Sequence, residues 1–309
     1  MSSPKTLTAQ IFRFDPTTDS SPRYETVEVP YDKDMRVLDV LDYAVENHGL
    51  DVGYRWFCGV KRCGMCGVSV NGKPALACWE KATPGLKIDP LPNMKVVRDL
   101  VVDRSPYEQA TLTLNPVIER GEPYQGFPEA LTHKDFADAF KLMSCIECYV
   151  CTAACPVLAD ADGHSFVGPG SLVQLAKVAL HPKDRGNRAA LALKADIYAC
   201  VNCYQCSNVC PVGIDIVEDA IEKLKRICAA EPHGADETKH VHIFAGVIRD
   251  YGRIHPPTLM RRSRGVMDGM KKVSAAIAMY WKGKIQLRPR SIPKVEEVSR
   301  LVDKLERNK

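Results

Sequence analysis

Cysteine is the residue type that most constrains this sequence. The chain has thirteen cysteines in 309 residues, and twelve of them fall into three groups of four, which leaves only Cys228 outside. The opening stretch MSSPKTLTAQIFRF has no basic region followed by a long apolar run, so we expect no secretory signal and a cytoplasmic chain. Because the cytosol keeps thiols reduced, the cysteines are expected to bind metal rather than to form disulfides.

The first group has the spacing CxxxxCxxC, with a fourth cysteine after eleven further residues. This is the plant-type ferredoxin spacing for a 2Fe-2S cluster. Gly59, Gly64 and Gly67 lie between the thiols, where a loop around inorganic sulfide needs positive φ or close backbone approach. Zinc motifs normally contain two CxxC or CxxH pairs, and this group contains one. The expected 2Fe-2S ligands are Cys58, Cys63, Cys66 and Cys78.

The second and third groups repeat one motif, CxxCxxCxxxCP, as CIECYVCTAACP and CVNCYQCSNVCP. It matches the bacterial ferredoxin run, in which the fourth cysteine of each run ligates the other cluster. A pair of cysteine-only zinc sites is the alternative, and brown colour with visible absorbance separates the two. The expected ligands of the first 4Fe-4S cluster are Cys145, Cys148, Cys151 and Cys210. The expected ligands of the second are Cys155, Cys200, Cys203 and Cys206.

Apolar periodicity divides the chain into three parts. TLTAQIFRF and ETVEVPYD alternate at period two and predict strands, RVLDVLDYAVENHG predicts a helix, and LKIDPLP predicts a further strand. Turn signals near Ser105 and Pro106 end this α+β unit, and the sequence is helical from there to about residue 230. The predicted domains are 1–106, 107–230 and a cysteine-free extension, 231–309. The extension is predicted to bind a partner, and a solvated helical tail is the alternative.

Several other function classes are excluded. Hydrophobic residues make up 45% of the chain and charged residues 26%, as in ordinary folded proteins. A net charge of +4 gives no reason to expect nucleic-acid binding. No window reaches the roughly 20 apolar residues that cross a bilayer, so membrane association must come through a partner. Because no nucleotide, flavin or nicotinamide motif is present, we assign no catalytic residue and expect electron transfer alone.

The order of the motifs resembles the iron–sulfur subunit of the succinate dehydrogenase and fumarate reductase family. The resemblance rests on CGVKRCGMCGVSVNGKPALAC, CIECYVCTAACP, FVGPGSLVQLAK and CVNCYQCSNVCP, and it covers about residues 5 to 230. It implies a β-grasp 2Fe-2S ferredoxin domain followed by an all-α dicluster ferredoxin domain. It also implies a partner flavoprotein with FAD that interconverts succinate and fumarate or a related pair. The other partner would be a membrane-anchor subunit with quinone or a CCG-motif subunit, which would place the chain at the cytoplasmic face of the membrane.

Two features differ from most family members. Most lack a cysteine at the position of Cys203 and hold a 3Fe-4S cluster there, so the thiolate here predicts a second 4Fe-4S cluster, with 3Fe-4S as the alternative. After Cys155 and Pro156, where quinone-linked members often have tryptophans, this chain has Val157, Leu158, Ala159 and Asp160. The stretch AIAMYWKGKIQLRPRSIPKVEEVSRLVDKL is also similar to tails of heterodisulfide-reductase-like subunits. Together with Cys203, this tail favours the branch of the family that has a second 4Fe-4S cluster in place of the 3Fe-4S cluster and a heterodisulfide-reductase-like tail.

Three functions stay open at this point. The first is the electron-transfer subunit of a succinate or fumarate oxidoreductase complex. The second is a similar subunit, or a heterodisulfide-reductase-like carrier, that serves another flavoprotein acting on a different enoate or on a thiol or disulfide. The third is a free carrier that binds its partners transiently, for which the extension would be dispensable.

Overall fold

The computed structural model describes residues 6–160, 165–230, 236–270, 273–284, 286 and 288–307. These residues form two compact units, Met1–Lys225 and Arg226–Lys309. Residues 1–5 and 231–235, where the predicted first domain and the predicted extension begin, lie outside the described residues. The domain boundaries at 106 and 230 stay predictions.

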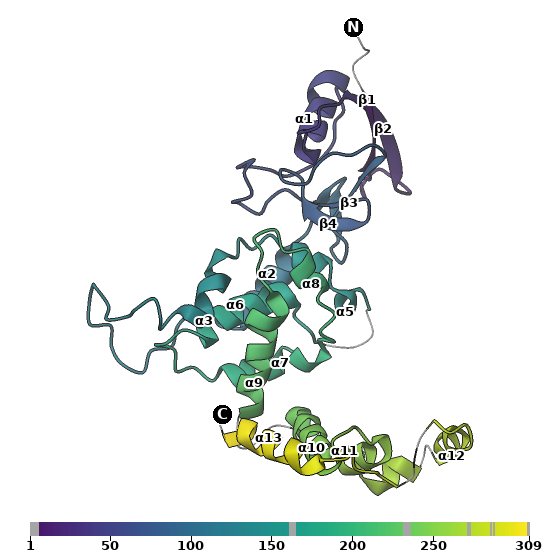
Figure 1. Ribbon diagram of the computed structural model, residues 1–309. Coiled ribbons are helices and arrows are strands. Elements are labelled where there is room, and N and C mark those ends of the chain that lie inside the picture. Colours follow the sequence, from purple (N-terminus) through teal and green to yellow (C-terminus); the bar gives the residue numbers. More distant parts are fainter. Residues whose placement is uncertain are drawn as a thin grey trace. The chain divides into compact units, whose positions relative to one another are not determined.

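A five-stranded sheet with the strand order β2-β1-β5-β3-β4 forms the first part of unit one. The strands are β1 (Thr6–Arg13), β2 (Arg23–Pro30), β3 (Gly67–Val70), β4 (Lys73–Leu76) and β5 (Leu86–Asp89). Burial alternates along β1, so its period-two pattern places Leu7, Ala9 and Ile11 in the core. Helix α1 (Val37–His48) buries Val37, Val40 and Leu41 in the same core and lies beside β1 and β2 (Figure 1). The α+β prediction is confirmed.

The hairpin between β3 and β4 brings Cys66 and Cys78 to one end of the sheet. Asn71 and Gly72 have φ values of 51° and 81°, the left-handed conformation that a two-residue hairpin turn needs. This turn fixes the antiparallel register, in which Gly67 pairs with Leu76. The amide of Ala77 then donates to the carbonyl of Cys66 at 2.8 Å. The fourth cysteine is thereby held beside the loop that carries the other three.

A short hairpin of β6 (Val96–Arg98) and β7 (Val101–Val102) was not predicted from the sequence. Asp99 connects it to the sheet, because its carboxylate accepts from the amides of Phe14 and Gly53 at 2.9 and 2.8 Å. The Nε of Arg13 also donates to Asp99 at 3.1 Å, and both side chains are buried. These bonds depend on residues more than forty positions apart, which local pattern does not reveal.

Helices and short helical turns make up the rest of unit one (Figure 1). They are α2 (Ser105–Thr113), α3 (Ala137–Phe140), η1 (Lys141–Ser144), α4 (Val150–Ala153), α5 (Pro156–Ala159), α6 (Pro169–Ala179), α7 (Arg188–Lys194), η2 (Ile197–Ala199), α8 (Gln205–Asn208), η3 (Val217–Ile221) and the start of α9 (Glu222–Ala230), a helix that continues into unit two after Lys225. Between residues 107 and 230, the described part of the chain pairs as strand only at the isolated bridge of Arg120 with Asp184. The helical prediction is confirmed.

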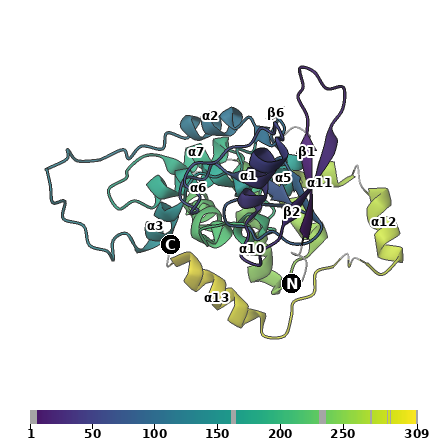
Figure 2. The ribbon, with the colours of Figure 1, turned by 90° about the horizontal axis from the view of Figure 1, so that it is seen from above.

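The segment between α2 and α3 extends away from the helices (Figures 1 and 2). Its base is held by Arg188, whose side chain is 3% exposed and pairs with Asp184 at 2.7 Å. Arg188 also donates to the carbonyls of Asn115 and Val117 at 2.9 and 2.7 Å. The buried guanidinium thus has the partners that offset its desolvation.

The second unit contains helices α10 (Asp236–Tyr251), α11 (Pro256–Met270), α12 (Val273–Trp281) and α13 (Val295–Arg307). Helix α10 packs against α11 and α13. Buried His255 bonds to the Thr258 hydroxyl at 2.8 Å and to the Gln286 carbonyl at 2.7 Å. In the part of the chain that the structure describes, no helix combines the length and the apolar character needed to span a bilayer.

Candidate metal centres

Three cysteines of the first group, Cys58, Cys63 and Cys66, lie in the loop between α1 and β3, and Cys78 follows β4. The Sγ of Cys58 accepts hydrogen bonds from the backbone amides of Val60, Arg62 and Cys63 at 3.4, 3.2 and 3.3 Å. These bonds lower the pKa of the Cys58 thiol to about 7, and the bond from Val60 makes the largest contribution. The loop therefore presents amide donors to a thiolate, the form in which cysteine binds iron.

Cys66 and Cys78 are buried at the end of the hairpin. Burial raises the pKa of the Cys66 thiol, and negative charge at Cys78 and Cys63 raises it further. A buried thiolate needs a compensating positive charge. Iron supplies that charge, so this donor set fits the predicted 2Fe-2S cluster.

The second group is completed by a cysteine from the third. One cavity is lined by Cys145, Cys148, Cys151 and Cys210, the four ligands predicted for the first 4Fe-4S cluster. Its wall also includes Gln174, whose amide donates to the Sγ of Cys145 at 3.4 Å. The backbone amide of Ile214 donates to the Sγ of Cys210 at the same distance. Polar donors therefore reach the sulfurs of both Cys145 and Cys210.

The predicted ligands of the second 4Fe-4S cluster are Cys155 from the first repeat and Cys200, Cys203 and Cys206 from the second. Burial raises the pKa of the Cys155 thiol, and negative charge at Cys200 and Cys203 raises it as well. Burial likewise raises the pKa of Cys206, and charge at Cys200, Cys155 and Cys203 adds to the rise. These four cysteines lie close enough to influence one another electrostatically, and their assignment to one cluster stays a prediction. Cys203 is exposed, whereas the other three are partly or fully buried.

The two repeats share one backbone conformation. Glu147 and Tyr149 have φ values of 53° and 58°, and the matching Asn202 and Tyr204 have values of 51° and 60°. Each repeat has a short 3-10 turn before its first cysteine and a one-turn helix, α4 or α8, around its third. The predicted pseudo-symmetry of the pair is therefore present in the backbone.

No three His, Cys, Asp or Glu side chains in the described ranges lie close enough together to bind a single metal ion. The assignment of the twelve cysteines to clusters rests on the groupings above and stays a prediction. Cys228 is fully buried and lies in none of the groups, as expected of a lone cysteine. His240 and His242 are exposed.

The first two cysteine loops touch. A Cβ atom added at Gly64 would lie 2.6 Å from the Ile146 carbonyl oxygen and 3.0 Å from the Cα of Cys148. Nearby, the Asn93 amide donates to the carbonyls of Ala153 and Cys155 at 3.1 and 3.0 Å. The predicted 2Fe-2S site and the predicted first 4Fe-4S site are thus adjacent.

Three large aromatic side chains next to the first group of cysteines are exposed to solvent, and the sequence analysis did not single them out. Trp56, Phe57 and Trp79 are 50%, 80% and 49% exposed. The ammonium group of Lys61 lies 4.1 Å from the centre of the Trp79 ring. The signal in the sequence is the position of these aromatic residues next to cysteines, at 56–58 and 78–79.

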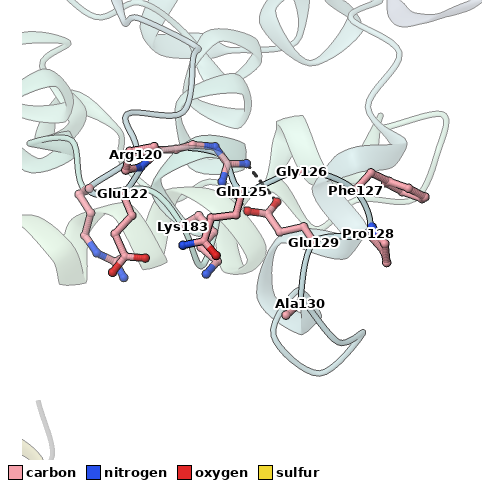
Figure 3. A pocket seen from close by; sticks show the side chains of 12 residues that line it. Arg120, Glu122, Gln125, Gly126, Phe127, Pro128, Glu129, Ala130 and Lys183 are labelled. Atoms are coloured by element: carbon pink, nitrogen blue, oxygen red, sulfur yellow. Dashed lines mark hydrogen bonds and ion pairs between the residues drawn. The ribbon is translucent and has the colours of Figure 1, made fainter.

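A cavity of about 550 Å³ lies elsewhere, in the segment between α2 and α3 (Figure 3). Its wall includes Arg120, Glu129, Lys183 and Arg185 and contains no cysteine. Arg120 forms two hydrogen bonds to Glu129, one of 3.0 Å, and Arg185 donates to two backbone carbonyls. Arg120 and Glu129 therefore neutralise each other at this cavity, while the bonds of Arg185 go to neutral carbonyls.

Comparison with known proteins identifies both cysteine-bearing regions. Residues 8–109 match the family model described as 2Fe-2S iron-sulfur cluster binding domain, and residues 141–214 match that described as 4Fe-4S dicluster domain. The fumarate reductase iron-sulfur subunit of Escherichia coli is 31% identical over 222 residues, which are 70% of this chain and 90% of that protein.

Two further relatives extend the comparison. A fumarate reductase (CoM/CoB) subunit of Methanothermobacter marburgensis is 31% identical over 228 residues, which are 74% of this chain. The chain spans about half the length, 45%, of that relative. A chain of the Mycobacterium smegmatis Sdh1 complex in the apo form has the same fold, with a TM-score of 0.69 at 24% identity, over 74% of this chain and 98% of the other.

Proposed function

The chain belongs to the family of iron–sulfur subunits of succinate dehydrogenases and fumarate reductases, and on this premise we propose that it connects an FAD-containing flavoprotein subunit to a second redox partner. Succinate or fumarate would react on the flavoprotein. The observation that carries this proposal is the contact of the first two cysteine loops at Gly64 and Cys148, because clusters bound at these loops would be neighbours.

Twelve cysteines would hold the clusters in the three sets given above, with each fourth cysteine exchanged between the two repeats. When bound, the clusters accept and release single electrons. The chain's own residues would supply thiolates, amide donors to sulfur, and the hairpin and helices that fix the sites. The shared cavity of Cys145 and Cys210 supports the exchange.

The 2Fe-2S loop would face the flavoprotein. Trp56, Phe57 and Trp79 support this, because exposed aromatic side chains clustered in one region are typical of interfaces. The neighbouring Lys61 adds a positive charge at the same place.

The second repeat would face the other partner. Cys203 is exposed, and the nearby Val201 and Tyr204 are 68% and 39% exposed. The thiol of Cys203 would complete a 4Fe-4S cluster at this site, in place of the 3Fe-4S cluster of most family members. We propose that the partner is a quinone-linked anchor or a CCG-motif subunit, and that it holds the chain at the cytoplasmic face of a membrane.

A different flavoprotein substrate is the second candidate function. Two observations favour it: the similarity of the tail to heterodisulfide-reductase-like subunits, and the relative that is named as part of a CoM/CoB fumarate reductase. In this case the cluster sites would be the same, and the substrate would be another enoate or a thiol or disulfide.

Purification of the native complex tests the proposal. We expect a flavoprotein to co-purify and the complex to reduce fumarate with a reduced viologen dye. Intact clusters without fumarate turnover would favour the second candidate. A chain truncated after residue 230 that still co-elutes with the flavoprotein would show that the extension is not needed for that contact.

A further inference from the structure

Arg104 lies where the first two cysteine loops meet. It directly precedes α2, and its side chain is 13% exposed. Its Nη1 donates to the carbonyl of Gly64 at 3.4 Å, and its Nη2 donates to the carbonyl of Glu147. One guanidinium group therefore bonds to the backbone of both loops, beside Cys63 in one and Cys148 in the other.

The guanidinium also packs against side chains from both loops. Its central carbon lies 4.7 Å from the centre of the Tyr149 ring, and Nη1 lies 3.8 Å from the sulfur of Met65. The planar, five-donor guanidinium suits this arrangement, because it stacks on a ring while its donors reach two carbonyls. A lysine ammonium has the same charge without this planar set of donors.

The charge of Arg104 is only partly neutralised. Its Nε is buried and has no hydrogen-bond partner. The carboxylate of Glu108 lies 3.6 Å away, on a side chain that is 54% exposed and therefore screened by water. The other contacts are to neutral carbonyls and an aromatic ring. A net positive charge is thus present at the junction of two predicted cluster sites.

This charge lies next to a predicted ligand. Nη2 of Arg104 donates to the carbonyl of Glu147, the residue directly before Cys148. A positive charge attracts any negative charge that is added nearby. A cluster gains one negative charge when it is reduced, so Arg104 favours its reduced form.

We propose that Arg104 is a positioning residue that joins the two cysteine loops and raises the reduction potential of the cluster held by Cys148. The inference rests on the proposed function, because it requires clusters at both loops. It involves no bond formation and no proton transfer. It assigns two separable roles to one side chain: the hydrogen bonds align the loops, and the charge adjusts the potential.

The experiment compares Arg104→Gln, Arg104→Lys and the control Arg23→Gln in the full-length, cluster-loaded chain. Arg23 pairs with Asp19 on the surface, so its replacement changes the net charge equally without touching either loop. The measurements are the reduction potential of each cluster, by redox titration followed by electron paramagnetic resonance, and the thermal midpoint of unfolding.

We expect Arg104→Gln to lower the potential of the first 4Fe-4S cluster and the thermal midpoint. We expect Arg104→Lys to restore the potential and not the midpoint, because it has the charge without the paired donors. Wild-type potentials in Arg104→Gln would overturn the inference. If Arg104→Gln does not bind its clusters, Arg104→Lys provides the test. A wild-type thermal midpoint of unfolding in Arg104→Lys would overturn the positioning role. Absence of clusters in the wild-type chain would instead contradict the proposed function.

Discussion

The side-chain amide of Gln174 lies 3.4 Å from the Sγ of Cys145 and donates a hydrogen bond to it. Gln174 belongs to α6 and is buried, so the bond is sheltered from competing water. Cys145 lies 29 residues earlier in the chain. A helix outside both cysteine motifs therefore contributes to the surroundings of the predicted first 4Fe-4S cluster.

Replacement of Gln174 by leucine is expected to lower the reduction potential of that cluster. Hydrogen bonds to cluster sulfurs reduce their electron density and favour the reduced state. Redox titration followed by electron paramagnetic resonance measures the effect. Gln10→Leu, on the exposed face of β1, is the matched control, and an equal potential in both variants would contradict the role of Gln174.

Gly64→Ala is expected to destabilise the chain more than Gly49→Ala. Both glycines have positive φ, 69° and 63°, so each replacement costs about 1–2 kcal/mol of backbone strain. An added Cβ has open space at Gly49 but would lie 2.6 Å from a backbone oxygen at Gly64, which adds about 1–3 kcal/mol of overpacking. Denaturant unfolding of the loaded protein measures the difference. Equal losses would mean that the two loops are not in contact.

Serine variants of Cys210 and Cys155, the fourth cysteines of the two repeats, are expected to damage different clusters. Cys210→Ser is expected to damage the first 4Fe-4S cluster, although Cys210 belongs to the second repeat. Because that cluster site adjoins the 2Fe-2S site, the paramagnetic relaxation of the reduced 2Fe-2S signal should change as well. Cys155→Ser should damage the second cluster and leave this relaxation as in the wild type. The reverse pattern would refute the exchange.

Cys203→Ser is expected to convert the second 4Fe-4S cluster to a 3Fe-4S cluster. The exposed Cys203 would be the ligand of the iron that is lost. The oxidised variant should show a three-iron electron paramagnetic resonance signal that is absent from the freshly oxidised wild type. A three-iron signal in the wild type itself would contradict the assignment of Cys203.

Local patterns predicted the elements but not the contacts between them. The alternation in β1 and the apolar spacing of α1 each depend on a few neighbouring residues, and both elements are present. The hairpin of β6 and β7 was missed, because its strands are short and its attachment through Asp99 depends on distant partners.

The same distinction applies to the site. The predicted grouping of the cysteines came from their spacing and from the proline that ends each CxxCxxCxxxCP run. Most ligands of one set lie within a short loop, and the fourth cysteine is exchanged between the two repeats as in bacterial ferredoxins. Arg104, Gln174 and Asn93 were not found, because each reaches a cysteine loop from another part of the chain. Nothing in a single sequence marks an arginine that precedes a helix as a bridge between two loops.

Iron and sulfide analysis of anaerobically prepared protein, together with its visible spectrum, tests the central claim most directly. Three clusters predict a brown protein with about ten irons and about ten sulfides per chain. A colourless protein that contains zinc or no metal would contradict the claim that the twelve cysteines hold iron–sulfur clusters.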